Sequence, residues 1–201
     1  MINNALSIAG SDPSGGAGIQ ADLKVFSAHN IYGMAAITAL TAQNTTGVSA
    51  IKTLSADFVA EQIKTVFADI RVDAVKIGMI ANTEIAEAVA STLNKVKAKN
   101  IVLDPVMIAK GGASLLAEDA IGCIREILVP MADILTPNLP EAAALLNEPE
   151  ARNREDMLCQ AKALLGMGLN GGKEISAFPQ TRMEGSDSLN HKLVYHKLPP
   201  S

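Results

Sequence analysis

A glycine-rich turn near the start of the chain has the composition of a ligand-binding loop. It reads GSDPSGGAG over residues 10–18 and joins a short apolar run, 5–9, to an amphipathic stretch, 17–29. Glycines let backbone N–H groups approach a ligand closely, and a helix start favours anions or polar ligand atoms. The turn contains neither the phosphate-loop pattern G-x-x-x-x-G-K-[ST] nor the dinucleotide pattern G-x-G-x-x-G. A tight strand-to-helix turn without a ligand therefore explains it about as well as a binding loop does.

Two side chains further along have groups that suit a small polar molecule. Asp22 lies one helical turn after Gly18, and Gln43 ends an apolar run. An amide offers both a donor and an acceptor, which suits the edge of a nitrogen heterocycle. Each residue also has a structural alternative, because an acidic residue near a helix start stabilises the helix dipole and an amide can bond a neighbouring loop. For Asp22 the structural alternative is the stronger one, whereas for Gln43 the structural and the binding explanations are equally strong.

Carboxylates also follow two later apolar runs. Asp104 opens the segment DPV directly after 101–103, and Asn138 and Glu141 begin and end the segment NLPE after 132–135. A carboxylate at the carboxyl end of a parallel strand is placed to face a ligand or a metal-bound phosphate. Asn138 and Glu141 fit a helix-capping box equally well. The functional alternative is that Glu141 helps to bind nucleotide phosphates through Mg²⁺ or its waters.

Short apolar runs alternate with longer amphipathic ones, and this rhythm predicts the elements that must position these side chains. Strands alternating with crossover helices predict a three-layer α/β/α fold around a mostly parallel sheet, with ligands at the carboxyl ends of the strands. Ser55 and Asn82 are expected to cap two of the helices. The expected strands are 5–9, 33–42, 73–77, 101–103 and 132–135, with 48–54 extending or pairing with the second. The expected helices are 17–29, one starting at 55, one starting at 82, 117–128, 139–146 and 153–165.

The overall composition is that of a soluble single-domain protein. The chain has 201 residues, of which 48% are apolar and 19% charged, and its formal charge is −4. Scattered Lys and Arg residues and a negative balance argue against nucleic-acid binding. No secretory leader and no run near the ~20 apolar residues of a membrane helix occur, so we expect a cytoplasmic protein that binds no membrane.

Five segments, in this order and spacing, resemble the hydroxymethylpyrimidine/phosphomethylpyrimidine kinases of thiamine biosynthesis, which belong to the ribokinase-like superfamily. They are ALSIAGSDPSGGAGIQADLK, TALTAQNTTGV, KIGM, VLDPVM and TPNLPEAAALL. The resemblance covers about 1–167. It implies a ribokinase-like fold and ATP- and Mg²⁺-dependent phosphorylation of 4-amino-5-hydroxymethyl-2-methylpyrimidine and then of its monophosphate. The alternatives are a pyridoxal/pyridoxine kinase of the same superfamily and a non-catalytic pyrimidine-binding protein.

The resemblance also implies roles for individual residues. Gln43 would pair with the ring edge, Asp22 would hold the exocyclic or hydroxymethyl group, and Met79 and Val106 would pack on the ring faces. Asp104 and Glu141 would contact Mg²⁺ through water. The implied pyrimidine pocket consists of Ala17, Asp22, Gln43, Met79 and Val106. The implied phosphate and ATP side consists of Asp104, Asn138 and Glu141.

The last stretch of the chain departs from the family. Relatives continue with a further strand, a K-G-G stretch and a G-T-G-C loop, whose N–H groups form an anion hole and whose cysteine is taken as the base. Nothing in 168–201 matches, so no catalytic residue is assigned and activity of this chain is in question. We expect an incomplete kinase domain over 1–167 and an irregular tail over 168–201, with the C-terminal part of the fold missing or altered.

Three origins of the tail compete: a frame-shifted or truncated gene product, a sequence joined across undetermined segments, or a divergent end. The first two are favoured, because a sheet edge and an apolar helix face would otherwise lie open. We therefore expect a chain that is poorly stable or depends on oligomerisation. The resemblance also raises the possibility of a homodimer.

Overall fold

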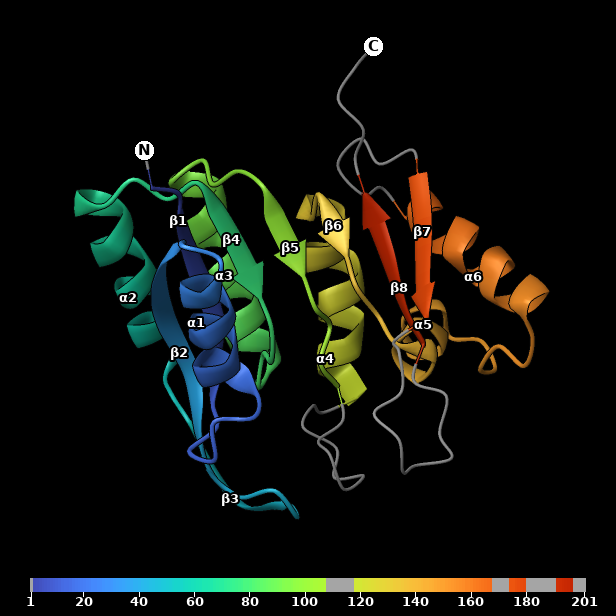
Figure 1. Cartoon of the computed structure of the whole chain (residues 1–201), viewed down its shortest axis with the longest axis horizontal. Helices are drawn as coiled ribbons and strands as arrows, with labels where there is room; N and C mark the ends of the chain where they lie inside the picture. The colour runs from blue at the N-terminus through green and yellow to red at the C-terminus, as the bar shows by residue number, and fades with distance from the viewer. Residues whose placement is uncertain (1, 108–117, 168–173, 180–190, 197–201) are drawn as a thin grey trace.

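A mostly parallel sheet forms the centre of the molecule (Figure 1). The computed structural model describes residues 2–107, 118–167, 174–179 and 191–196. The strands in this part of the chain are β1 (Asn4–Ser11), β2 (Tyr32–Gln43), β3 (Val48–Thr53), β4 (Ala74–Ile77), β5 (Ile101–Leu103), β6 (Ile134–Leu135), β7 (Glu174–Pro179) and β8 (His191–His196). They lie in the order β3-β2-β1-β4-β5-β6-β8-β7. The five strands from β2 to β6 in this order are parallel, as predicted, whereas β3, β8 and β7 join antiparallel neighbours.

Helices cover both faces of this sheet, which confirms the predicted three-layer α/β/α fold. Helix α1 crosses one face, in front of β1 and β2 in Figure 1, and α2 and α3 lie against the other. The helices are α1 (Gly18–Ala28), α2 (Ala56–Asp69), α3 (Thr83–Lys95), α4 (Glu118–Cys123), α5 (Leu139–Leu146) and α6 (Arg154–Gly166). Helix α4 continues as a π-helical turn, η1 (Ile124–Leu128), and a 3₁₀ turn, η2 (Val129–Met131). Among the described helices, none is long and apolar enough to cross a membrane.

Helix capping follows the predictions in one case and departs from them in another. The side chain of Asn82 accepts a hydrogen bond from the N–H of Ile85, which satisfies a backbone donor that the first turn of α3 leaves free. Ser55 occupies the corresponding position before α2, but its side chain makes no capping hydrogen bond. Ser55 therefore occupies the predicted N-cap position, but the capping hydrogen bond expected from its side chain is not formed.

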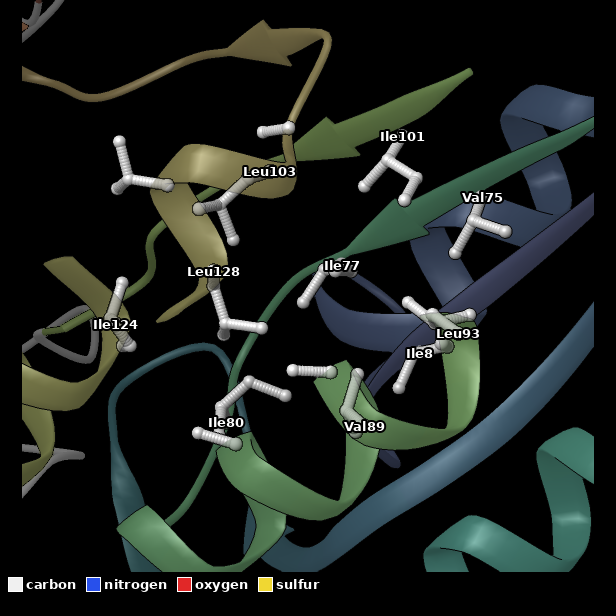
Figure 2. Packing of buried hydrophobic residues seen from close by; sticks show 14 of the residues in the cluster. Ile8, Val75, Ile77, Ile80, Val89, Leu93, Ile101, Leu103, Ile124 and Leu128 are labelled. Atoms are coloured by element: carbon white, nitrogen blue, oxygen red, sulfur yellow. The ribbon is translucent and has the colours of Figure 1, made fainter. Parts of the chain in front are cut away.

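The core lies between the sheet and the layer formed by α2, α3 and η1 (Figure 2). Alternate residues of the parallel strands point into it, because successive side chains of a strand face opposite sides of a sheet. Figure 2 shows Ile77 and Leu103 from the strands facing Val89 and Leu128 from the helices. The largest fully buried side chains are Leu6, Ile8, Ile63, Ile77, Ile80, Ile85, Leu93, Leu103, Leu128, Leu135 and Leu145.

The end of the chain differs from the irregular tail that the sequence predicts. Strands β7 and β8 form an antiparallel hairpin, and β8 pairs with β6 through Leu135 and Tyr195. The edge of β6 is therefore paired rather than open. Sequence patterns missed this hairpin because its strands are stabilised by pairing with each other and with β6, which no local periodicity reports. The rest of the tail, 168–173, 180–190 and 197–201, lies outside the described residues.

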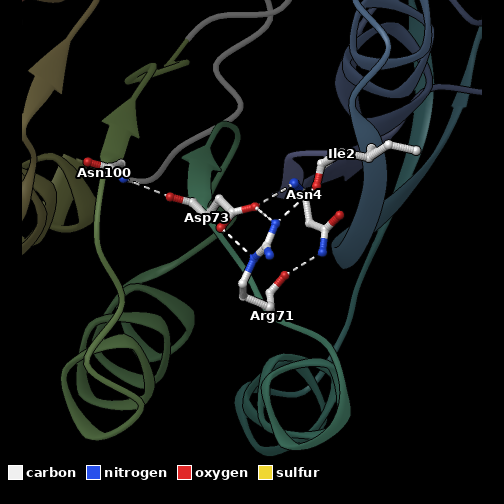
Figure 3. Close-up of polar contacts among 5 residues, drawn as sticks. All are labelled: Ile2, Asn4, Arg71, Asp73 and Asn100. Carbon is white, nitrogen blue, oxygen red and sulfur yellow. Dashed lines mark hydrogen bonds and ion pairs between the residues drawn. The ribbon is translucent and has the colours of Figure 1, made fainter.

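At the amino ends of the central strands, a polar cluster ties three chain segments together (Figure 3). Arg71 Nε and Nη2 lie 2.8 and 2.9 Å from the carboxylate oxygens of Asp73. The same carboxylate accepts the backbone N–H of Asn4 at 2.8 Å, and the guanidinium donates to the carbonyl of Ile2. The Asn100 amide donates to the Asp73 carbonyl. The cluster therefore joins the approaches to β1, β4 and β5 at the edge opposite the expected ligand edge.

We predict that truncating a core leucine destabilises the chain far more than truncating an exposed one. Leu93 on α3 is 1% exposed and Leu158 on α6 is 40% exposed. Leu93→Ala removes buried methyl groups and leaves a cavity, which costs about 2–5 kcal/mol of unfolding free energy, whereas Leu158→Ala should cost under about 1 kcal/mol. Urea unfolding followed by circular dichroism measures both. Equal losses would contradict the placement of the core.

Stability should also depend on the charge of Asp73 at low pH. Hydrogen bonds from Arg71 and Asn4, aided by the nearby positive charge, hold the pKa of Asp73 below its ordinary value. A carboxyl group whose pKa is lower in the folded state stabilises the fold above its unfolded-state pKa, about 3.9. This contribution is lost as the pH falls through the lowered folded-state pKa. Asp73→Asn should therefore melt below the wild type at pH 7, with the gap closing as the pH falls below the unfolded-state pKa and through the lowered folded-state pKa.

The matched control for this experiment is Glu87→Gln, which removes a carboxylate from the exposed face of α3. Its melting temperature should follow that of the wild type at every pH. A gap between wild type and Asp73→Asn that stays constant down to pH 2 would contradict the assignment, because it would arise from something other than the ionised carboxylate.

Candidate functional site

The carboxyl ends of the central strands form one continuous edge. The backbone ladder continues one residue past β4, β5 and β6, where the N–H groups of Gly78, Asp104 and Thr136 donate to the neighbouring strand at 2.9, 2.8 and 3.0 Å. Side chains at and just beyond these positions therefore project from one edge of the sheet, which is where parallel α/β sheets bind ligands.

The glycine-rich turn between β1 and α1 is organised by its own carboxylate. Buried Asp12 accepts hydrogen bonds from the N–H and hydroxyl of Ser14 at 2.8 and 2.7 Å, and from the N–H groups of Gly16 and Ala17 at 3.1 and 2.9 Å. Burial raises the pKa of Asp12, but these hydrogen bonds outweigh it and hold the pKa below its ordinary value. Asp12 therefore already occupies the N–H groups of Ser14, Gly16 and Ala17, so this part of the loop does not offer them to an anion.

Two further features hold the turn against the sheet. The side chain of Gln20 accepts from the N–H of Asp12 and donates to the hydroxyl of Ser11. Gly18 has a positive φ of 56°, and a Cβ at this position would overlap the carbonyl oxygen of Gly10. Only glycine permits this close approach of two backbones. Contacts within the protein therefore fix the conformation of the loop without a ligand.

Between α1 and the sheet, one lysine joins two of the predicted site residues. Lys76 Nζ lies 2.8 and 3.1 Å from the carboxylate oxygens of Asp22 and 3.6 Å from Asp104 Oδ2. The hydroxyl of Ser7 donates to Asp22 at 2.7 Å, and the hydroxyl of Thr136 donates to Asp104 at 3.1 Å. The structure therefore brings Asp22 and Asp104 into one polar cluster, which we call the Lys76 cluster: Ser7, Asp22, Lys76, Asp104 and Thr136.

The period of the strands explains why these side chains meet. In β1, Leu6 and Ile8 point into the core, so Ser7 between them points toward α1. In β4, Val75 and Ile77 are buried in the same core, so Lys76 points the other way. Ser7 and Lys76 therefore both lie on the face of the sheet that α1 covers.

Met79 lies where β1, β2 and the end of β4 meet. Its backbone carbonyl accepts the buried hydroxyl of Thr38 at 2.8 Å. Its side chain is buried, and its sulfur would lie 3.0 Å from a Cβ added at Gly10. The absence of a side chain at Gly10 therefore leaves room for Met79 beside the glycine-rich turn.

Gln43 ends β2 next to the same turn but on another side of it. Its Oε1 lies 3.1 Å from the hydroxyl oxygen of Thr41, which donates to the carbonyl of Ser11. An open hollow of about 570 Å³ adjoins it, lined by Pro13, Ala42, Gln43, Asn44, Thr46, Gly47, Val48 and Ser49. Gln43 thus lies near the loop. Among the described residues, its side chain forms a hydrogen bond with Thr41 and none with the Lys76 cluster.

Asn138 and Glu141 form the capping box that the sequence offered as one of two explanations. The Asn138 side chain accepts the N–H of Glu141 at 2.8 Å, and the buried Glu141 carboxylate accepts the N–H of Asn138 at 2.8 Å. Both therefore have a structural role at the start of α5.

The remaining predicted residues lie on the loops at the ligand edge. Ala17 precedes α1 and donates its N–H to Asp12. Val106 is half-buried, two residues after Asp104, whose carbonyl accepts its N–H at 2.8 Å. The chain immediately after Met107, from 108 to 117, lies outside the described residues.

Sequence patterns missed Lys76 and Asp12. A charged residue inside a short, otherwise apolar strand has to find a partner, so Lys76 in AVKI was a usable indication of a paired site. Asp12 was hidden in a loop whose glycines and proline already explained a turn. Its position before Ser14 and Gly16 fits an aspartate that bonds to the following backbone, which is a further usable indication.

We predict that Gly18→Ala disrupts the glycine-rich turn. The added methyl meets the carbonyl of Gly10, and the positive φ is costly for alanine, so the loss should be at least about 2 kcal/mol of unfolding free energy. Gly122→Ala in α4 is the matched control, because a Cβ there meets nothing within 4 Å. It should be neutral or stabilising, since alanine favours helix. Denaturant unfolding measures the free energy of unfolding of both variants. An unchanged value for Gly18→Ala would contradict the turn geometry.

Two curated bacterial proteins have sequences similar to that of this chain. A hydroxymethylpyrimidine/phosphomethylpyrimidine kinase of Salmonella typhimurium is 57% identical over 165 residues, which cover 82% of this chain and 62% of the relative. Its counterpart in Escherichia coli is 56% identical with the same coverage. This chain thus spans about three fifths of the length of these curated relatives.

Solved structures give the same result. The crystal structure of a phosphomethylpyrimidine kinase from Clostridium difficile matches with a TM-score of 0.79 and 41% identity, covering 97% of this chain and 84% of that one. A Bacillus subtilis pyridoxal kinase, solved as an ADP complex, matches with a TM-score of 0.79 and 33% identity, covering 100% and 78%. The sequence model of the phosphomethylpyrimidine kinase family matches residues 12–172. The chain therefore belongs to the phosphomethylpyrimidine kinase family.

Proposed function

We propose that this chain binds 4-amino-5-hydroxymethyl-2-methylpyrimidine and takes part in its ATP-dependent phosphorylation, and in that of its monophosphate, in thiamine biosynthesis. The observation that carries the proposal is the meeting of Asp22 and Asp104 around Lys76 at the carboxyl edge of the sheet. Family membership supplies the substrate class, because the similar proteins of Salmonella typhimurium and Escherichia coli carry that activity in their names.

Ring recognition is assigned to the loops around the glycine-rich turn. Asp22 is a fixed acceptor there, because Ser7 and Lys76 hold its Oδ2 while Oδ1, which accepts from Lys76, keeps capacity for a further donor. An aminopyrimidine brings such donors in its amino group and hydroxymethyl arm. Gln43 would read the ring edge. The apolar and backbone surface of the pocket would come from Ala17, Met79 and Val106.

The phosphate side is assigned to Asp104, Asn138 and Glu141. Among the described residues, no three His, Cys, Asp or Glu side chains gather as a metal site. Asp104 faces Lys76, and Glu141 faces the N–H of Asn138. We assign Asp104 and Glu141 each a contact with Mg²⁺ through water, with nucleotide phosphates as further ligands, which is the usual arrangement for Mg²⁺ in phosphoryl transfer. When bound, Mg²⁺ would screen the charge of the phosphates.

The chain's own residues would supply alignment rather than covalent chemistry. Phosphoryl transfer needs a positioned hydroxyl, a positioned γ-phosphoryl group and screened charge. Asp22 would position the hydroxymethyl arm, Gln43 would hold the ring edge, and Asp104 would face the incoming phosphate. No base is assigned, because 168–201 contains no G-T-G-C segment. The protein would act in the cytoplasm, and the family resemblance raises a homodimer as one possible assembly.

Two alternatives each have an observation in their favour. The structural match to a Bacillus subtilis pyridoxal kinase covers the whole of this chain, and pyridoxal offers a flat ring of similar size. The missing G-T-G-C segment favours a protein that binds the pyrimidine without phosphorylating it. Calorimetric titration with hydroxymethylpyrimidine and with pyridoxine separates the rings, and a coupled ADP-release assay separates kinase from binder. Preference for pyridoxine would overturn the proposed substrate.

We predict that Gln43→Ala weakens binding of hydroxymethylpyrimidine by about tenfold, since the ring edge loses a two-way hydrogen-bonding partner. Asn94→Ala, which removes an exposed amide from α3, is the matched control and should bind as the wild type does. Isothermal titration calorimetry measures both dissociation constants. Unchanged affinity in Gln43→Ala would remove Gln43 from the pocket.

A further inference from the structure

We propose that Lys76 is a positioning residue of the pyrimidine site. Its ammonium group fixes Asp22, on the substrate side, and Asp104, on the phosphate side, in one arrangement. The proposal rests on the proposed function, and it assigns a role to a residue that neither the sequence patterns nor the implied family pocket singled out.

The first support is the geometry of the ammonium group. Lys76 Nζ is within hydrogen-bonding distance of both oxygens of Asp22 and within ion-pair distance of Asp104. The three side chains are 25%, 12% and 13% exposed, in the order Lys76, Asp22 and Asp104. A salt bridge this far from solvent holds its partners more firmly than a surface pair, because screening by water and salt is weak.

The second support is the space that the fold reserves for this group. A Cβ added at Gly78 would lie 3.5 Å from Lys76 Nζ and 3.0 Å from the Cβ of Ala9. A side chain at position 78 would therefore crowd Ala9 on β1 and would lie in van der Waals contact with the ammonium group. The Lys76 side chain thus runs from the middle of β4 to the level of Gly78, at the edge where ligands bind.

The third support is the charge of the cluster. Two carboxylates share one ammonium group, so removing that group would leave two like charges close together and partly buried. The hydroxyl groups of Ser7 and Thr136 hold one oxygen each but carry no charge. Lys76 is therefore what allows α1 and the end of β5 to present acids to one site.

A lysine in this place has a simpler explanation, which is that it only balances charge for stability. The two roles make different predictions when the charge is restored without the lysine. Lys76→Met combined with Asp104→Asn has the same net cluster charge as the wild type, yet Asp22 loses its ammonium partner. Charge balance alone predicts that this double variant recovers both stability and ligand binding. A positioning role predicts that stability recovers while ligand binding does not.

The experiment measures thermal melting and calorimetric titration with hydroxymethylpyrimidine on the full chain. Lys76→Met should melt roughly 6–10 °C below the wild type and bind at least about tenfold more weakly. The double variant should regain at least half of the lost melting temperature and stay at least about fivefold weaker in binding. Lys64→Met is the matched control: Lys64 is an exposed lysine on α2, 3.7 Å from Glu61, and both readouts should stay unchanged.

Each contrary outcome has a definite meaning. Wild-type affinity in Lys76→Met, or in the double variant, would overturn the positioning role and leave the proposed function standing. If Lys76→Met does not fold, the double variant alone decides between the two roles. A wild type that binds no hydroxymethylpyrimidine would overturn the proposed function, and this role of Lys76 with it.

Discussion

The alternation of side chains along the central parallel strands is the constraint on which the site depends. In β1 and β4 the flanking aliphatic residues face the core, so the polar residues Ser7 and Lys76 between them are turned toward α1. A shift of one residue in register would exchange the two faces and bury the lysine in the core. The same hydrophobic effect that fixes the register therefore places the Lys76 cluster at the ligand edge.

The glycine-rich turn works differently from a phosphate loop. In a phosphate loop the backbone N–H groups at a helix start remain available for an anionic ligand. Here the carboxylate of Asp12 takes the N–H groups of Ser14, Gly16 and Ala17. The turn is thus rigid and carries its own negative charge. This arrangement suits a ring that brings hydrogen-bond donors, in keeping with an aminopyrimidine, and it leaves phosphate to other parts of the edge.

Much of the fold could be predicted from the sequence, because its central elements carry strong local patterns. The apolar runs of β1 and β5, the Asn82 cap and the capping box of Asn138 and Glu141 each depend on neighbours a few residues away. The hairpin β7–β8 was not predicted, because its strands depend on distant pairing. The predicted helix over 117–128 was correct in place, but it continues past Cys123 as a π-helical turn that periodicity does not reveal.

The candidate site was predictable in part for the same reason. Motifs indicated Asp22 and Asp104 separately, and their position at one edge followed from the rule for parallel sheets. That they share one ammonium group was not predictable, because Lys76 is 54 residues from Asp22 in sequence and its contact depends on the direction of a side chain. Sequence patterns name candidates, whereas the partners of each candidate are set by tertiary packing.

The central claim is that the pyrimidine binds at the carboxyl edge, beside the glycine-rich turn. The most direct measurement is ¹³C-methyl NMR of the methionines during titration with hydroxymethylpyrimidine. Met79 borders the turn, whereas Met157 lies on α6. The account predicts a saturable shift of the Met79 methyl resonance, identified by its loss in Met79→Leu, with Met157 unmoved. Saturable binding that leaves the Met79 resonance in place would contradict it.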